Sequence, residues 1–216
     1  MNRAVLGVSL AAAVLGSTAN AAEARKLIYL HGRIVQDQQS ARPKHPEWGY
    51  YELEAILATF RERGFDVTGE IRPKANTLSQ SADRVVGQVK ALIAAGTPAS
   101  RITVVGGSMG ASIALIASVR LQDPELRFAV LAACMSANVP ALLAEHGGRP
   151  AGRFLAFIEK SDELSQPCPA WRDGSEPGKA PLGVREIVLD TGLHHGFLYR
   201  PLPEWVESVV AFANER

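Results

Sequence analysis

The residues best suited to chemistry lie in the pentapeptide GGSMG at 106–110. A β-branched run at 102–105 leads into it, and an alanine-rich helical pattern follows at once. This context fits the G-x-S-x-G nucleophile elbow, where a serine at a sharp strand-to-helix turn holds its hydroxyl clear of the sheet. Glycine two positions to either side removes side chains that would clash at so tight a corner. The stretch therefore predicts that Ser108 is a nucleophile; a tight structural turn is the simpler alternative.

A serine hydroxyl needs a base to take its proton, and the base needs a third group to orient it. His194 and His195 stand just beyond the last predicted strand, in the segment LDTGLHHGF. Between the serine and the histidines, Asp162 follows the fifth predicted strand, and Glu159 is the alternative acid at the end of that strand. Residues beyond the ends of parallel strands meet at one sheet edge, so the order serine, acid, histidine predicts a catalytic triad there.

The elements that must position these residues alternate between strands and helices. Six apolar, β-branched runs read as strands, at 26–31, 65–71, 102–107, 127–133, 153–159 and 184–190. Helical patterns that end near glycine or proline lie at 50–64, 80–96 and 110–122, and a last one closes the chain at 203–215. Most of these runs lack the alternation of apolar and polar residues that is typical of a sheet with one solvent-exposed face. They are therefore predicted to be buried on both faces. The pattern predicts one α/β domain, a doubly wound, mainly parallel six-stranded sheet with helices on both faces.

Two connections are longer than packing requires, at 32–47 and 160–182, and both follow strands. They should therefore emerge at the carboxyl edge of the sheet, where open α/β sheets bind ligands. In the first, His45 and Trp48 could touch a substrate, with surface packing as the equal alternative. His31, at a strand end before glycine, is expected to support its loop by hydrogen bonds.

At these residues the chain resembles the α/β-hydrolase superfamily, and more loosely its small, lidless, esterase-like and dienelactone-hydrolase-like members. The resemblance spans roughly 26–212 and rests on the elbow, SDEL at 161–164, HHGF at 194–197 and LHG at 30–32. In such relatives the catalytic histidine precedes Gly-Phe, and the acid follows its strand within a few residues. The resemblance thus implies a triad of Ser108, His195 and Asp162, with no cap domain, cofactor or metal.

The resemblance also implies an oxyanion hole made by two backbone N–H groups. One belongs to Met109, directly after the serine, and the other to Arg33, the residue after His-Gly. The chain departs from the family here, because Arg33 replaces the more usual small or aromatic residue. It also lacks the antiparallel strands that often precede the first parallel strand. The exact oxyanion donor therefore stays open at this point.

The first residues read as a secretory signal peptide, with a charge at Arg3, an apolar run over 4–16, and small residues before a cleavage site after Ala21. The apolar run is too short to span a bilayer as a helix, so the mature chain is expected to be periplasmic or secreted, without membrane insertion. The mature domain would cover 22–216.

The composition of this mature domain gives no reason to expect a nucleic acid or an anionic membrane as partner, because the whole chain has a formal net charge of only +1. Its two cysteines, Cys134 and Cys168, would be exported with it. In an oxidising compartment, two cysteines without metal-binding spacing suggest one disulfide.

Together these features predict an exported serine hydrolase that cleaves short-chain carboxylic esters of small molecules through an acyl-enzyme intermediate. The same residues could cleave an amide, peptide or thioester, because neither fold nor triad sets the leaving group. A non-catalytic binding protein on the same scaffold is the alternative from a different class. The sequence sets no oligomeric state.

Overall fold

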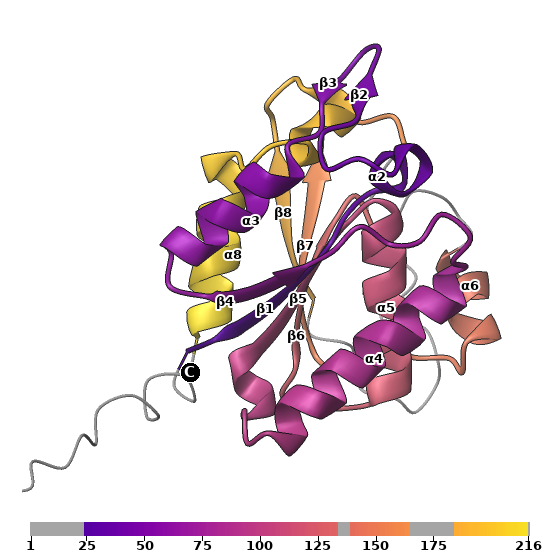
Figure 1. Cartoon of the computed structure of the whole chain (residues 1–216), viewed down its shortest axis with the longest axis vertical. Coiled ribbons are helices and arrows are strands. Elements are labelled where there is room, and N and C mark those ends of the chain that lie inside the picture. Colours follow the sequence, from indigo (N-terminus) through magenta and orange to yellow (C-terminus); the bar gives the residue numbers. More distant parts are fainter. Residues whose placement is uncertain (1–23, 134–138, 165–183, 216) are drawn as a thin grey trace, which may run out of the picture.

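The computed structural model describes residues 24–133, 139–164 and 184–215 (Figure 1). Its main sheet has six strands, all parallel, in the order β4-β1-β5-β6-β7-β8. The strands are β1 (Lys26–Leu30), β4 (Asp66–Gly69), β5 (Ile102–Gly107), β6 (Arg127–Leu131), β7 (Arg153–Glu159) and β8 (Val184–Leu189). The predicted doubly wound α/β sheet is confirmed, and each predicted strand run contains one of these strands.

Helices cover both faces of this sheet (Figure 1). On one face lie α3 (Leu53–Glu62) and α8 (Pro203–Asn214). On the other lie α4 (Leu78–Ala94), α5 (Met109–Leu121) and α6 (Val139–Glu145). In the described part of the chain, no helix is both long enough and apolar enough to cross a membrane.

The core is densest around the central strands, and there the sequence prediction of burial on both faces is right. Every residue of β5 and β6 is buried, and α5 is apolar nearly all round because it packs between the sheet and its neighbours α4 and α6. The edge strands differ, since β4 alternates between exposed and half-buried residues and β8 is buried only at Leu189. An edge strand has a neighbour on one side only, so its side chains are less completely covered.

The order of the strands fixes where a ligand can bind. The chain runs from β1 to β4 on one side and then crosses to β5 on the other side of β1. Loops therefore leave β1 and β5 in opposite directions and open a crevice at their carboxyl ends, the usual ligand site of an open α/β sheet. Leu30 of β1 pairs with Gly106 of β5, so the segments that begin at His31 and Ser108 start side by side.

The first long connection contains structure that the sequence did not predict. It forms a short helix, α2 (Arg33–Gln38), and then a small antiparallel hairpin of β2 (Lys44–His45) and β3 (Gly49–Tyr50). Two-residue strands give no detectable periodicity, and Pro43 and Pro46 argue against a strand. The predicted disulfide between Cys134 and Cys168, and most of the second long connection, lie outside the described residues.

Candidate active site

Ser108 lies at the corner between β5 and α5, with a backbone conformation of φ 54° and ψ −119°. Such a positive φ is strained for a residue with a side chain, and strain of this kind concentrates at functional sites. The backbone N–H of Ser108 donates to Leu131 O of the neighbouring strand at 2.9 Å, which anchors the corner to the sheet. The sharp strand-to-helix corner expected from the sequence is therefore formed.

Two glycines make this corner possible. A Cβ atom at Gly106 would collide with the backbone carbonyl of Gly110, and one at Gly110 would collide with the carbonyl oxygen of Leu30. A Cβ atom at Gly107 would instead lie 3.6 Å from the Leu198 side chain, an ordinary contact. The glycines of the G-x-S-x-G pattern are thus sterically required, whereas the glycine between them is not.

This difference gives a prediction about stability. Gly106→Ala and Gly110→Ala are each expected to lower the free energy of unfolding by at least ~3 kcal/mol, because backbone atoms cannot move aside as a side chain can. Gly107→Ala is the matched control and should change it by less than ~1 kcal/mol. Urea unfolding of the three variants checks this, and equal stability across the set would contradict the steric account.

Asp162 and His195 meet at the same edge of the sheet. The Nδ1–H of His195 donates to Asp162 Oδ2 at 2.7 Å, and both side chains are almost completely buried. Asp162 lies three residues beyond the end of β7, and its other oxygen, Oδ1, accepts from the backbone N–H of Leu164 at 3.0 Å. His195 lies in η2 (His194–Leu198), which follows β8. The hydrogen bond fixes Nδ1 as the protonated nitrogen and leaves Nε2 to act as a base.

Ser108 and His195 line the same cavity, which has a volume of about 370 Å³. Gly32 also lines the cavity, and a Cβ added to it would lie 3.7 Å from the Cβ of Ser108. A cavity of this size suits a small molecule. The structure therefore brings the predicted serine and histidine to one cavity and bonds the histidine to the predicted acid.

The hairpin of β2 and β3 forms one wall of this cavity. The Trp48 ring lies 5.1 Å from the His195 ring between centroids, and His45 stacks on Trp48 at 3.9 Å. A Cβ added to Gly196 would lie 2.9 Å from the Cβ of Trp48, so the glycine after the histidine lets the hairpin approach. Trp48 therefore lines the cavity, and its contact with a substrate stays a prediction.

Both expected oxyanion donors are the first residues of helices. Arg33 begins α2 and Met109 begins α5, and the two helices start beside one another because β1 and β5 are paired. The first N–H groups of a helix have no acceptor within the helix, and they lie at its positive end. Neither backbone N–H group has an acceptor within its own helix, and their role as an oxyanion hole next to Ser108 stays a prediction.

A buried guanidinium holds the segment that carries Arg33. Arg72 Nη2 donates to His31 O at 2.6 Å, and Arg72 Nε donates to Gln36 Oε1 at 3.0 Å. The backbone N–H of Arg72 donates to His31 Nε2 at 3.1 Å, and His31 Nδ1–H donates to Gly32 O at 2.8 Å. The expectation that His31 supports its loop is confirmed, while Arg72 gave no signal in the sequence.

His31 makes the stability of the protein depend on pH. Burial, together with the Arg72 charge, lowers the pKa of His31 from 6.5 to about 4. Between these values the unfolded chain binds a proton that the folded chain does not, so stability should fall by up to about 3 kcal/mol as the pH drops from 6.5 to 4. His31→Gln should flatten this slope. Unfolding free energies of both proteins across that range check it, and an unchanged slope would show that His31 does not contribute.

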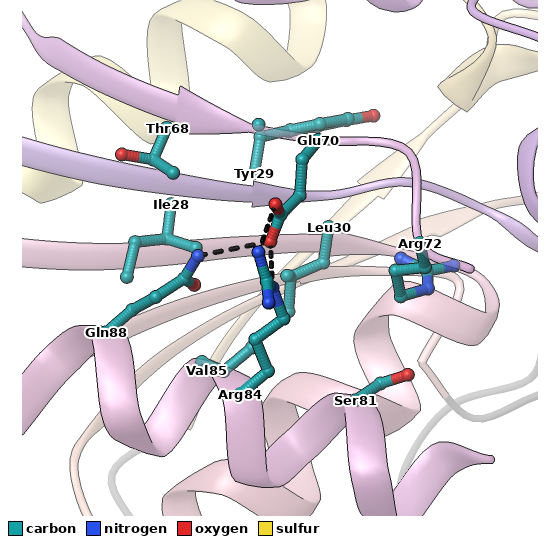
Figure 2. A pocket seen from close by; sticks show the side chains of 11 residues that line it. Ile28, Tyr29, Leu30, Thr68, Glu70, Arg72, Ser81, Arg84, Val85 and Gln88 are labelled. Atoms are coloured by element: carbon teal, nitrogen blue, oxygen red, sulfur yellow. Dashed lines mark hydrogen bonds and ion pairs between the residues drawn. The ribbon is translucent and has the colours of Figure 1, made fainter. Parts of the chain in front are cut away.

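A second cavity lies between β1, β4 and α4 (Figure 2). Arg84 and Gln88 of α4 donate to the Glu70 carboxylate across it, and Arg72 and Ser81 also line it. Its volume of about 20 Å³ leaves room for little more than one water molecule.

A wider hollow of about 740 Å³ adjoins the cavity at Ser108, shares His45, Trp48 and His195 with it, and is also lined by Asp162 and His194. The cavity at Ser108 is the one that brings the predicted serine and histidine together, so it is the candidate active site.

The two alternatives left open by the sequence, Glu159 and His194, have other partners. Glu159 is the last residue of β7, and its carboxylate accepts hydrogen bonds from Ser161 and Thr191. His194 is exposed, and its Nδ1–H donates to Ser161 O at 2.7 Å. Neither side chain lines the cavity with Ser108.

The described residues 24–133, 139–164 and 184–215 contain no group of three or more His, Cys, Asp or Glu side chains arranged to hold a metal ion.

Comparison with known proteins shows similarity in structure. The sequence matches no protein-family model and no curated protein. A metagenome-derived lipolytic enzyme is 13% identical, with a TM-score of 0.56 over 89% of this chain and 95% of that one. A fungal esterase from Rhizomucor miehei is also 13% identical, with a TM-score of 0.58 over 88% of this chain and 74% of that one.

A third similar structure is a protein of unknown function from Agrobacterium tumefaciens, classed with the α/β hydrolases. It is 17% identical, with a TM-score of 0.52 over 88% of this chain and 83% of that one. Likenesses at such low identity establish the fold and leave the activity open. The parallel sheet of this chain, the strained corner at Ser108 and the similarity to these structures show that the chain has the α/β-hydrolase fold.

Proposed function

We propose that the protein is a serine hydrolase that cleaves carboxylic esters. The observation that carries this proposal is the 2.7 Å hydrogen bond between buried Asp162 and His195, beside a cavity that Ser108 also lines. The esterase and the lipolytic enzyme of similar structure support an ester as the substrate. The fold alone would not indicate the substrate, since proteins with the same fold catalyse many different reactions.

In the first half of the reaction, Ser108 Oγ attacks the acyl carbon while His195 Nε2 takes the hydroxyl proton. The carbonyl π electrons move to the oxygen, which accepts hydrogen bonds from the backbone N–H groups of Arg33 and Met109. Asp162 keeps the imidazole oriented and stabilises its positive charge. The C–O bond then breaks, and the alcohol leaves with the proton from His195.

In the second half, water attacks the acyl-enzyme and His195 takes a proton from it. The oxyanion forms again at the same two N–H groups. Ser108 then leaves with that proton, and the carboxylic acid is released. The proton that left with the alcohol is replaced by one from water, so Ser108 and His195 return to their starting states and the cycle requires no cofactor.

Pre-steady-state kinetics with an aryl ester test this proposal. An acyl-enzyme that breaks down slowly gives a burst of phenol equal to the enzyme concentration, followed by slower turnover. Turnover of amides or thioesters, but not of esters, would keep the mechanism and change the substrate class. No reaction with any of them would favour a binding protein on this scaffold.

We expect a preference for short acyl chains, from acetate to butyrate. The connection between β6 and β7 contains one helix in its described part, the seven-residue α6, and too little chain for a lid. Each methylene buried contributes about 0.8 kcal/mol, and an open site can bury only a few. Aryl esters of graded acyl length check this, and a clear preference for long chains or activation by emulsified lipid would contradict it.

We also propose that the protein acts after export to the periplasm or the medium, as the sequence of residues 1–21 suggests. Sequencing of the mature N-terminus tests this, with Ala22 as the expected first residue. An intact Met1 on the cell-associated protein would contradict it.

A further inference from the structure

The Glu159 carboxylate, which the catalytic proposal does not use, is almost completely buried, with 1% of the residue exposed. Its Oε1 accepts from the backbone N–H and the hydroxyl of Ser161, at 3.2 and 2.9 Å. Its Oε2 accepts from the backbone N–H and the hydroxyl of Thr191, at 3.0 and 2.8 Å. The backbone N–H of Gly192 makes a longer contact with Oε1, at 3.4 Å.

These bonds keep the carboxylate charged. Burial alone would raise the pKa of Glu159, but the hydrogen bonds from Thr191 and Ser161 outweigh burial and hold the pKa below its usual value. A carboxylate that receives several hydrogen bonds in a buried site is a strong and specific anchor.

The anchored residues belong to the two segments that carry the acid and the histidine. Ser161 directly precedes Asp162, and Thr191 lies in the segment between β8 and η2, four residues before His195. Ser161 continues the connection, because its hydroxyl accepts from the backbone N–H of His194 at 3.0 Å. The Glu159 carboxylate therefore joins the two segments at points one residue before Asp162 and four residues before His195.

We propose that Glu159 is a positioning residue for the catalytic pair: it sets the Asp162–His195 geometry by holding the two segments together. This inference rests on the proposed function. Catalytic groups must be held close to their productive geometry, and a displacement of 1 Å can cost about 100-fold in rate. Glu159 would act through Ser161 and Thr191, without contact with the substrate.

Glu159→Gln tests this with little change in volume. The amide NH₂ of glutamine would replace one of the two carboxylate oxygens and face backbone N–H donors, so the hydrogen bonds to one of the two segments would be lost. We expect kcat to fall about 10- to 100-fold with KM within about twofold. We also expect the low-field proton resonance of the His195 Nδ1–H to Asp162 bond to weaken or shift.

Asp190→Asn is the matched control. Asp190 Oδ2 pairs with Lys160 Nζ at 2.7 Å and joins the same two segments, but both side chains are exposed to solvent. Solvent screens such a pair, so its loss should leave kcat within about twofold.

Three results would overturn the inference. One is a wild-type kcat in Glu159→Gln. The second is an unchanged proton resonance with only a loss of thermal stability, which would mark a purely structural role. The third is a loss as large as that of Ser108→Ala together with an active Asp162→Asn, which would make Glu159 the catalytic acid.

If Glu159→Gln does not fold, Thr191→Val supplies the test. It removes one donor and keeps the charge, and it should lower kcat about 3- to 10-fold, whereas an unchanged kcat would overturn the inference. A fluorophosphonate assay of the wild-type protein keeps this test separate from the proposed function. If the wild type is not labelled, the proposed function fails; if it is labelled and the variants keep full activity, only the role of Glu159 fails.

Discussion

Ser108→Ala is expected to lower kcat for ester hydrolysis by about 10⁴-fold or more, because the proposed mechanism takes its attacking oxygen from the Ser108 hydroxyl. The hydroxyl lines the cavity and lies at the end of a strand that ordinary packing already holds in place. Steady-state hydrolysis of an aryl butyrate by the purified variant measures the loss. Activity within tenfold of the wild type would exclude Ser108 as the nucleophile.

The fold of this variant should be unchanged, which separates lost chemistry from lost structure. Alanine at position 108 keeps the strained φ of 54° and removes only an oxygen atom. Ser108→Gly is a useful companion, because glycine adopts a positive φ without strain and should raise the unfolding midpoint while being equally inactive. A midpoint below that of the wild type would show that the serine has a structural role.

His195→Ala should be as damaging as Ser108→Ala, and His194→Ala much less so. The His195 ring is buried, accepts its orientation from Asp162 and lines the cavity with Ser108, so its loss removes the proposed base. The His194 ring bonds to a backbone oxygen of Ser161, and its loss should cost about tenfold or less. Initial rates of the two variants with one aryl ester compare them directly.

A control for His194 follows from its backbone. His194 has a φ of 51°, a conformation that asparagine tolerates better than alanine does. His194→Asn should therefore be at least as active as His194→Ala. If either His194 variant were less active than His195→Ala, the assignment of the two histidines would have to be reversed.

The parts of the site that the sequence predicts are those with local causes. The corner at Ser108 requires residues without a Cβ atom at 106 and 110, so the two glycines predict it from a stretch of five residues. The apolar, β-branched composition of the buried strands predicts them, and their alternation with helices predicts that they run parallel. From these, the sheet edge that holds Ser108, Asp162 and His195 can be placed without a structure.

What the sequence leaves open depends on orientation and on distant partners. Asp162 and Glu159 are three positions apart, and although the predicted strand already ends at Glu159, only the structure shows that its carboxylate turns to Thr191. His194 and His195 are adjacent, and the positive φ of His194 helps to decide which ring faces the acid. Neither feature has a signal in a single sequence.

The buried polar network around the first loop could not be predicted for a related reason. Arg72 lies 41 residues after His31, and the two meet only because β1 and β4 pair in the sheet. In the sequence, Arg72 is one of 23 Lys and Arg residues and most such residues are solvent-exposed. Its role depends on tertiary packing alone.

Reaction of the folded protein with a fluorophosphonate, followed by intact-mass and peptide mass spectrometry, tests the central claim most directly. The phosphonate reacts only with a serine that a neighbouring base has activated, so it reports the nucleophile without any knowledge of the natural substrate. The catalytic proposal predicts one equivalent of label, located on Ser108, and none on Ser108→Ala or His195→Ala. An unlabelled folded protein, or label on another residue, would contradict it.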